Sequence, residues 1–167
     1  MDVSRISAPD RRGVYPSDLQ EGIRRGLDCM TDVKSPEARS HNMAAIKGRN
    51  TKPEEIVRKF LFSQGFRYRK NDPTLPGKPD IVLPKYKTVV FVNGCFWHLH
   101  EGCKYFVWPR QNAEFWKNKL TGNTVRDQRN YALLVNAGWH VIVVWECELK
   151  QSREKTLSTL AGRIKHG

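Results

Sequence analysis

Four side chains that commonly bind metals stand out in the sequence. Cys95, His100 and Cys103 lie within nine residues of one another, and Cys147 follows a later apolar run. Three thiols and one imidazole are a typical ligand set for a closed tetrahedral zinc site. The alternative is three core cysteines and a surface histidine, but a polar loop that contains glycine is an unusual place for core thiols. The pattern favours a structural zinc that fixes the loop to a sheet.

Asp80 is a candidate ligand for a second metal, because it follows the Pro- and Gly-containing segment 75–79 and begins an apolar run. Pro79 holds the residue before it in an extended conformation, so the carboxylate is expected at a sheet edge with little freedom. An oxygen ligand in that position suits magnesium. An aspartate that merely ends a turn is the alternative, and Asp80 therefore needs catalytic partners.

His98 remains once the zinc ligands are assigned. A histidine beside a metal-bound carboxylate suits general acid or base chemistry, and Asp127 is a candidate to orient its imidazole. A further metal ligand or a surface histidine is an equal alternative for His98.

Large aromatic residues accompany these polar groups. Phe96, Trp97 and Trp116 could stack on bases or enter between base pairs, although a place in the core is the commoner role of tryptophan. Trp139 and Trp145 belong to an apolar run and are predicted to lie in the core.

The charge of the chain indicates its partner. The formal net charge is +12 and the pI is about 9.8, and the first thirty residues contribute none of this excess. A basic domain with interleaved aromatic residues is suited to nucleic acid, whereas a merely soluble basic protein is the plainer alternative. No apolar run is long enough to cross a membrane and no signal peptide is recognisable, so a cytoplasmic protein is expected. Residues 1–33 are predicted to be a flexible extension, and residues 34–167 one domain.

The order of sequence patterns predicts a mixed α/β sandwich. Thr51 and Glu54 have the form of a capping box, which predicts a helix that runs to Gly65. Runs rich in β-branched residues predict paired strands over 80–83 and 88–92. The remaining expected elements are strands over 66–70 and 139–145 and helices over 112–119, 123–136 and 152–164.

Between Arg39 and Leu149 the sequence resembles one known family, the very-short-patch mismatch endonucleases (Vsr), which nick DNA at T:G mismatches. The motifs that carry the resemblance are RSHNMAAIK (39–47), NTKPE (50–54), LPGKPD (75–80), VFVNGCFWH (90–98), EFW (114–116), RD (126–127) and GWHVIVVWECEL (138–149).

The resemblance implies a restriction-endonuclease-like mixed sheet flanked by helices, a structural zinc and a magnesium-dependent active site. It implies roles for the residues that match the family's motifs, with Glu54 near the active site as well as at the helix start. Val92 stands where the family has threonine, which allows a metal contact only through the backbone carbonyl. The implied catalytic residues are Asp80, His98, Asp127 and Glu54, the magnesium ligands Asp80 and the Val92 carbonyl, the zinc ligands Cys95, His100, Cys103 and Cys147, and the intercalating residues Phe96, Trp97, Trp116 and Met43.

The implied reaction is magnesium-dependent phosphodiester hydrolysis on the 5′ side of the thymine in a T:G mismatch, which initiates very short patch repair. Double-stranded DNA with that mismatch is the expected partner of a monomeric enzyme in the prokaryotic cytoplasm, together with other mismatch-repair proteins. The alternatives are a restriction endonuclease that cuts both strands and a zinc-containing DNA-binding module without catalysis. Absence of the usual second acid and lysine from residues 90–94 favours the histidine-based reaction.

Overall fold

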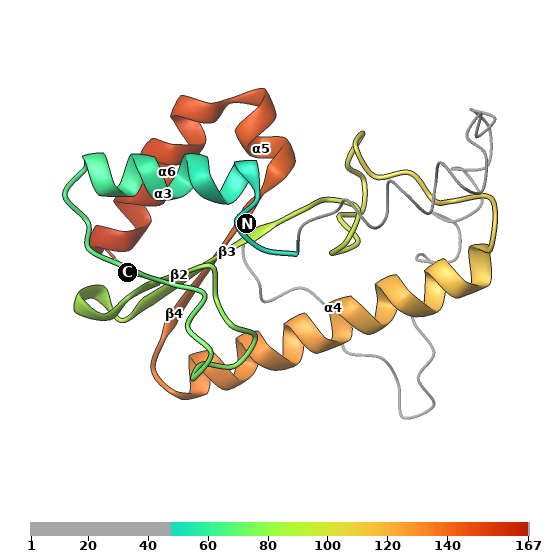
Figure 1. Ribbon diagram of the computed structural model, residues 1–167, viewed down its shortest axis with the longest axis horizontal. Helices are drawn as coiled ribbons and strands as arrows, with labels where there is room; N and C mark the ends of the chain where they lie inside the picture. The colour runs from blue at the N-terminus through green and yellow to red at the C-terminus, as the bar shows by residue number, and fades with distance from the viewer. Residues whose placement is uncertain (1–47, 167) are drawn as a thin grey trace.

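A computed structural model describes residues 48–166. A four-stranded sheet in the order β1-β2-β3-β4 has helices on both faces, as Figure 1 shows. This arrangement confirms the predicted mixed α/β fold. The strands are β1 (Arg69–Lys70), β2 (Ile81–Leu83), β3 (Thr88–Asn93) and β4 (His140–Trp145), and the helices are α3 (Lys52–Ser63), α4 (Ala113–Asn136), α5 (Glu146–Gln151) and α6 (Arg153–His166).

The two central pairings of the sheet have opposite directions. β2 and β3 are antiparallel and joined by a short 3-10 turn over Pro84–Tyr86, which confirms the predicted strand pair. β3 and β4 are parallel, so the chain must cross the sheet between them. The long loop after β3 and helix α4 make this crossover, and the carboxyl ends of β3 and β4 therefore lie side by side.

Side chains that alternate along the buried strands form a core on each face of the sheet. Figure 1 shows α3 and α6 together on one face and α4 on the other. Val90 and Ile142 face α3 and α6, where they share a cluster with Leu61, whereas Val89 faces the α4 side with Leu134. Full burial of each such side chain is worth about 1.5–3 kcal/mol. The two cores fix both layers on the sheet.

Helix α3 begins with the predicted capping box. The Glu54 N–H donates to the Thr51 hydroxyl at 3.5 Å, and the Thr51 N–H donates to the Glu54 carboxylate at 3.2 Å. The helix ends at the expected place, because Gly65 adopts a φ of 83° and the Phe66 N–H donates to the Leu61 carbonyl. This bond places Phe66 in the helix-ending turn, so the strand predicted over 66–70 comprises only β1.

Helix α4 is a single helix, and the two helices predicted over 112–119 and 123–136 were wrong as separate elements. Gly122 lies between the two predicted helices, and a glycine inside a helix costs about 1 kcal/mol relative to alanine. The helix continues through it because the buried Leu120 and Leu134 hold both halves. Asn112, where the first predicted helix begins, instead precedes α4 in a left-handed conformation and without a side-chain cap bond.

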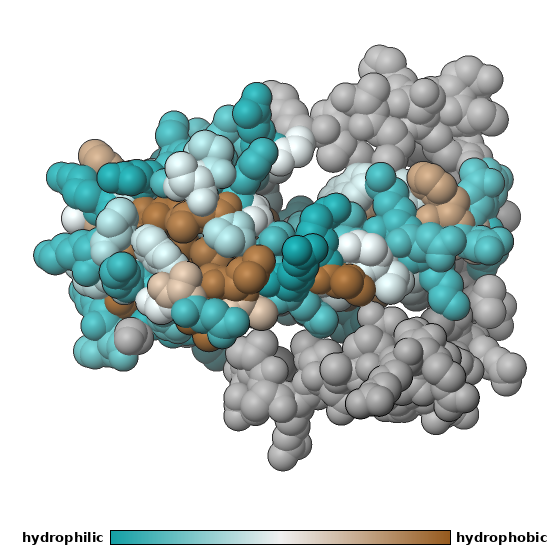
Figure 2. Space-filling model, turned by 90° about the horizontal axis from the view of Figure 1, so that it is seen from below, coloured by the Kyte–Doolittle hydropathy of each residue, from teal (hydrophilic) through white to brown (hydrophobic). Residues whose placement is uncertain are grey.

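The surface of the α4 side is mixed in polarity. Figure 2 shows the face that carries α4, where hydrophobic side chains gather over one half and hydrophilic side chains cover much of the remainder. Within residues 48–166 no helix is long and apolar enough to span a membrane. The predicted extension over residues 1–33 and the intercalating residue Met43 lie outside the described residues and stay predictions.

Candidate active site and metal centre

The register of the parallel strands brings the predicted zinc ligands together. Asn93 on β3 pairs with Trp145 on β4, so Cys95 and Cys147 each follow a paired residue by two positions. Cys147 lies in the first turn of α5, a helix that the sequence did not predict. Two backbone hydrogen bonds fold the loop over residues 95–103 back on itself. The His100 N–H donates to the Cys95 carbonyl, and the Cys103 N–H donates to the His100 carbonyl.

We call Cys95, His100, Cys103 and Cys147 the metal-ligand cluster; their ligand atoms all lie within 4.8 Å of one another. Tetrahedral zinc with Zn–S bonds of about 2.3 Å requires sulfur atoms about 3.8 Å apart, so the spacing fits. The His100 Nδ1 atom lies 3.4 Å from the Cys147 Sγ atom, and the Tyr105 N–H donates to the Cys103 sulfur at 3.4 Å.

The protonation of the thiols bears on whether the cluster can bind a metal. Burial, together with the neighbouring Cys95 and Cys103 side chains, raises the pKa of Cys147 to about 12. Three adjacent thiolates would repel one another, whereas a bound divalent metal both deprotonates and holds thiols. The donor set therefore fits the predicted zinc.

Trp145 supports this cluster, and its prediction as a core residue was wrong. Its ring stacks on His100 with centroids 3.9 Å apart and planes 12° apart, while the side chain remains partly exposed. This contact fixes the plane of a metal-ligand imidazole. Trp139, by contrast, packs against the smaller core cluster on the α4 side.

Asp80 lies directly before the interior strand β2, and Lys78 has a φ of 49° rather than the extended conformation expected before Pro79. Its Oδ2 atom accepts a bond of 2.8 Å from the Val92 N–H on β3. Burial raises the pKa of Asp80 to about 6, and the Glu54 carboxylate acts in the same direction, against the Val92 bond. A strand residue directs its N–H and C=O to the same side, so the Val92 carbonyl faces Asp80 as well. The side of β3 that faces Asp80 thus offers a second oxygen of the kind that magnesium prefers.

Arg58 connects this carboxylate to α3, and the sequence reasoning missed it. Its Nη2 atom donates to the Glu54 carboxylate at 2.9 Å and to the Asp80 carbonyl at 3.1 Å. Arg58 and Glu54 are both buried, and the guanidinium also contacts the side-chain oxygens of Asn50 and Asn71. The four-residue spacing from Glu54 to Arg58 was the available signal. Glu54 thus serves in the helix cap and beside Asp80.

His98 meets Asp127 as predicted. The His98 Nδ1 atom lies 2.5 Å from the Asp127 Oδ2 atom on α4, and both side chains are mostly shielded from solvent. The imidazole also interacts electrostatically with Asp80, where it opposes the rise in that carboxyl's pKa. Asp80, His98 and Asp127 therefore converge from three separate elements.

The three predicted intercalating aromatic residues of the described chain form one cluster. Ring centroids are 5.2 Å apart for Phe96 and Trp97, 5.3 Å for Phe96 and Trp116, and 6.1 Å for Trp97 and Trp116. All three side chains are partly exposed. Phe106, which the sequence analysis did not single out, extends this aromatic cluster at 6.2 Å from Phe96.

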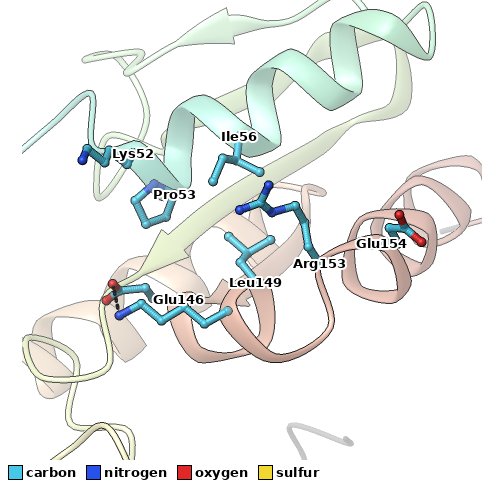
Figure 3. Close-up of a pocket in the computed structure, with 8 residues that line it drawn as sticks. Lys52, Pro53, Ile56, Glu146, Leu149, Arg153 and Glu154 are labelled. Atoms are coloured by element: carbon cyan, nitrogen blue, oxygen red, sulfur yellow. Dashed lines mark ion pairs between the residues drawn. The ribbon is translucent and has the colours of Figure 1, made fainter.

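A pocket of about 640 Å³ lies elsewhere, between the start of α3 and helices α5 and α6. Figure 3 shows Pro53 and Ile56 on one wall, with Leu149 and Arg153 opposite them. The residues that line it include none of the predicted catalytic or metal-binding side chains. Converging polar groups at the carboxyl end of β3, rather than a deep pocket, therefore mark the candidate active site.

The mixed sheet, with a carboxylate before β2 and a histidine after β3, places the chain in the restriction-endonuclease-like class of α/β proteins. Comparison with known proteins defines the family within this class. A family model described as DNA mismatch endonuclease Vsr matches residues 31–104. The chain belongs to the Vsr family of DNA mismatch endonucleases, which confirms the resemblance and makes it a DNA-cleaving hydrolase.

Individual relatives match over most of their length. The chain is 53% identical over 139 residues to the type II nicking enzyme V.NmeAIP of Neisseria meningitidis, covering 81% of this chain and 98% of the relative. It is 44% identical over 137 residues to the type II nicking enzyme V.XorIIP of Xanthomonas oryzae, covering 82% and 96%. It is 41% identical over 135 residues to DNA mismatch endonuclease Vsr of Escherichia coli, covering 81% and 86%.

Proposed function

We propose that the chain nicks one DNA strand on the 5′ side of the thymine in a T:G mismatch and so initiates very short patch repair. Family membership supports the reaction class. The observation that carries the proposal is the bond between His98 and Asp127 beside the partly buried Asp80 carboxylate. These groups can hold a hydrolytic metal and move a proton without a second acid and lysine.

Asp80 and the Val92 carbonyl would hold magnesium. When bound there, magnesium supplies charge stabilisation at the scissile phosphate. Arg58 and the Val92 N–H hold the Asp80 backbone and carboxylate in place, so little reorganisation is needed on binding. Glu54 adds a second negative charge beside Asp80, which favours a cation there.

His98 acts as the general base in this proposal. With its Nδ1–H donating to Asp127, the Nε2 atom carries the lone pair and can accept a proton from the attacking water. Asp127 then stabilises the imidazolium that forms. A fixed tautomer of this kind requires the histidine and its partner to be held rigidly.

Zinc in the metal-ligand cluster would hold the loop that carries both His98 and the aromatic residues. Phe96, Trp97 and Trp116 would enter the base stack, and Met43 would enter from the minor groove. A T:G pair opens more easily than a matched pair, so the cost of unstacking favours the mismatch. The net charge of +12 supports double-stranded DNA as the partner. We further propose a monomer in the prokaryotic cytoplasm that acts with other repair proteins.

The decisive experiment incubates the protein and magnesium with matched and T:G-mismatched duplexes of otherwise identical sequence. One nick 5′ to the mismatched thymine is expected, and sequencing gels locate it. Cleavage of both strands of the matched duplex would instead identify a restriction endonuclease, and no cleavage would identify a DNA-binding module. His98→Ala should abolish the nick, whereas the exposed His166→Ala should not.

A further inference from the structure

Three side chains of α4 hold the last residue of β3 and the loop that follows it. Asn123, Asp127 and Tyr131 are spaced by four residues, so they lie on one face of the helix. The Asn123 Nδ2 atom donates to the Trp97 carbonyl at 3.0 Å, Asp127 meets His98 at 2.5 Å, and the Asn93 Nδ2 atom donates to the Tyr131 hydroxyl at 3.1 Å. The predicted site contained only the middle one of these three contacts.

We propose that Asn123 and Tyr131 are positioning residues that, together with Asp127, align residues 93–98 along α4. Asn123 is further proposed to couple the placement of Trp97 in the base stack to the placement of His98 at the phosphate. This inference rests on the proposed function for its reaction, although the alignment itself can be measured without DNA.

The coupling follows from a shared peptide group. The carbonyl that Asn123 binds belongs to Trp97, and the same peptide contains the His98 N–H, which donates to the Gly94 carbonyl at 3.2 Å. Because a peptide group is planar and rigid, turning it moves the indole and the imidazole together. Trp97 also contacts Trp116, which lies on α4 two turns before Asn123. One helix thus holds the aromatic cluster and the proposed base in register.

Tyr131 supports the other end of the segment. Its ring packs on Phe91 with centroids 4.8 Å apart, and its hydroxyl oxygen accepts from Asn93, a buried amide. Because the oxygen accepts this bond, the hydroxyl hydrogen is available to a neighbouring acceptor. Burial raises the pKa of Tyr131, and the nearby Asp127 and Asp80 carboxylates add to the effect, so the hydroxyl remains a donor. Tyr131 therefore fixes the end of β3 beside the carboxylates.

The kinetic experiment compares Asn123→Ala and Tyr131→Phe with Gln128→Ala, an exposed position on the same helix. Each positioning variant should lower kcat on the T:G duplex about tenfold, which corresponds to the loss of one buried hydrogen bond. KM and the affinity for the duplex without added metal should change less than about twofold. Gln128→Ala should behave as wild type. An unchanged kcat, or a loss that arises only from KM, would overturn the proposal.

A second measurement separates failure of this inference from failure of the proposed function. Nitrogen NMR of labelled histidine should show His98 as one Nδ1–H tautomer in the wild type and in Gln128→Ala. In Asn123→Ala and in Tyr131→Phe the two tautomers should exchange, with folding confirmed by an unchanged methyl spectrum. If His98 keeps one fixed tautomer in both variants, the alignment role is wrong, whatever the protein does to DNA.

Discussion

The metal-ligand cluster and the candidate active site lie at the carboxyl end of the same strand, but they are held in different ways. The cluster draws three of its four ligands from one loop, and burial raises the pKa of its Cys147 thiol. The active site draws Asp80, His98 and Asp127 from three elements, and hydrogen bonds within the protein already fix each of them. In the proposed function a metal organises the first region, whereas the fold organises the second.

The largest effect is expected in the metal-ligand cluster, which is proposed to depend on a bound metal. Cys147→Ser should reduce bound zinc from one ion per chain to none, because one of the four ligands is lost. The loop should then lose several kcal/mol of stability, since structural zinc contributes directly to folding. Elemental analysis and limited proteolysis of the loop measure the two effects. Cys29→Ser removes a thiol outside the cluster and should retain the zinc; loss of zinc there too would contradict the assignment.

Asp80→Asn should separate activity from stability. Nicking should fall about a thousandfold, since the metal loses its charged ligand. Without added magnesium, however, the variant should unfold at higher denaturant concentration than the wild type at pH 7.5. The reason is that the folded protein must ionise a carboxyl whose pKa is raised from 3.8 to about 6.

The sign and pH range of this gain follow from proton linkage. Between pH 4 and 6 the folded wild type binds the Asp80 proton more tightly than the unfolded chain does, so its stability falls as the pH rises. The advantage of Asp80→Asn should therefore be absent near pH 4 and reach about 3 kcal/mol above pH 6. A constant advantage across this range would show that packing, and not charge, is responsible.

Two adjacent residues of α3 test whether buried contacts of the fold hold the active site. Arg58 pairs with Glu54 in the core, and Lys59 pairs with Glu55 in solvent, both at 2.9 Å. Arg58→Met should cost about 3 kcal/mol or more, because it leaves the Glu54 charge buried without a partner. Lys59→Met should leave the urea midpoint unchanged, since exposed pairs contribute little. Equal effects of the two substitutions would refute the distinction.

Thr51→Ala should give the smallest of these effects. The hydroxyl caps α3 and also donates to the Glu54 carboxylate at 2.8 Å. Its loss should lower the free energy of unfolding by about 1 kcal/mol, as for other helix caps. Nicking should fall only slightly, because Arg58 still holds Glu54. The exposed Ser63 at the other end of the helix provides a control, and Ser63→Ala should be nearly neutral. A large loss of nicking under conditions in which Thr51→Ala remains folded would place Thr51 in the active site itself.

The sequence predicted those parts of the site whose residue type restricts their chemistry. Cysteine and histidine at short spacing indicated the metal-ligand cluster, and a carboxylate before a buried strand indicated Asp80. The residues offered Asp127 only as a candidate partner of His98, and the family resemblance supported it, since residues 29 positions apart meet only through the crossover. Arg58, Asn123 and Tyr131 were missed because their residue types are common on ordinary helices. Only the hydrogen bonds in the folded chain show what these three side chains contact.

The unbroken helix α4 has a consequence for how the length of this chain can vary. One residue inserted between Asn123 and Tyr131 would rotate the later part of the helix by about 100° and withdraw at least one side chain from its contact. The loop between Cys103 and α4 has no helical repeat to preserve. Insertions and deletions among homologues are therefore expected in this loop and absent from residues 116–134. The number of residues in that part of α4 is constrained even where their identities vary.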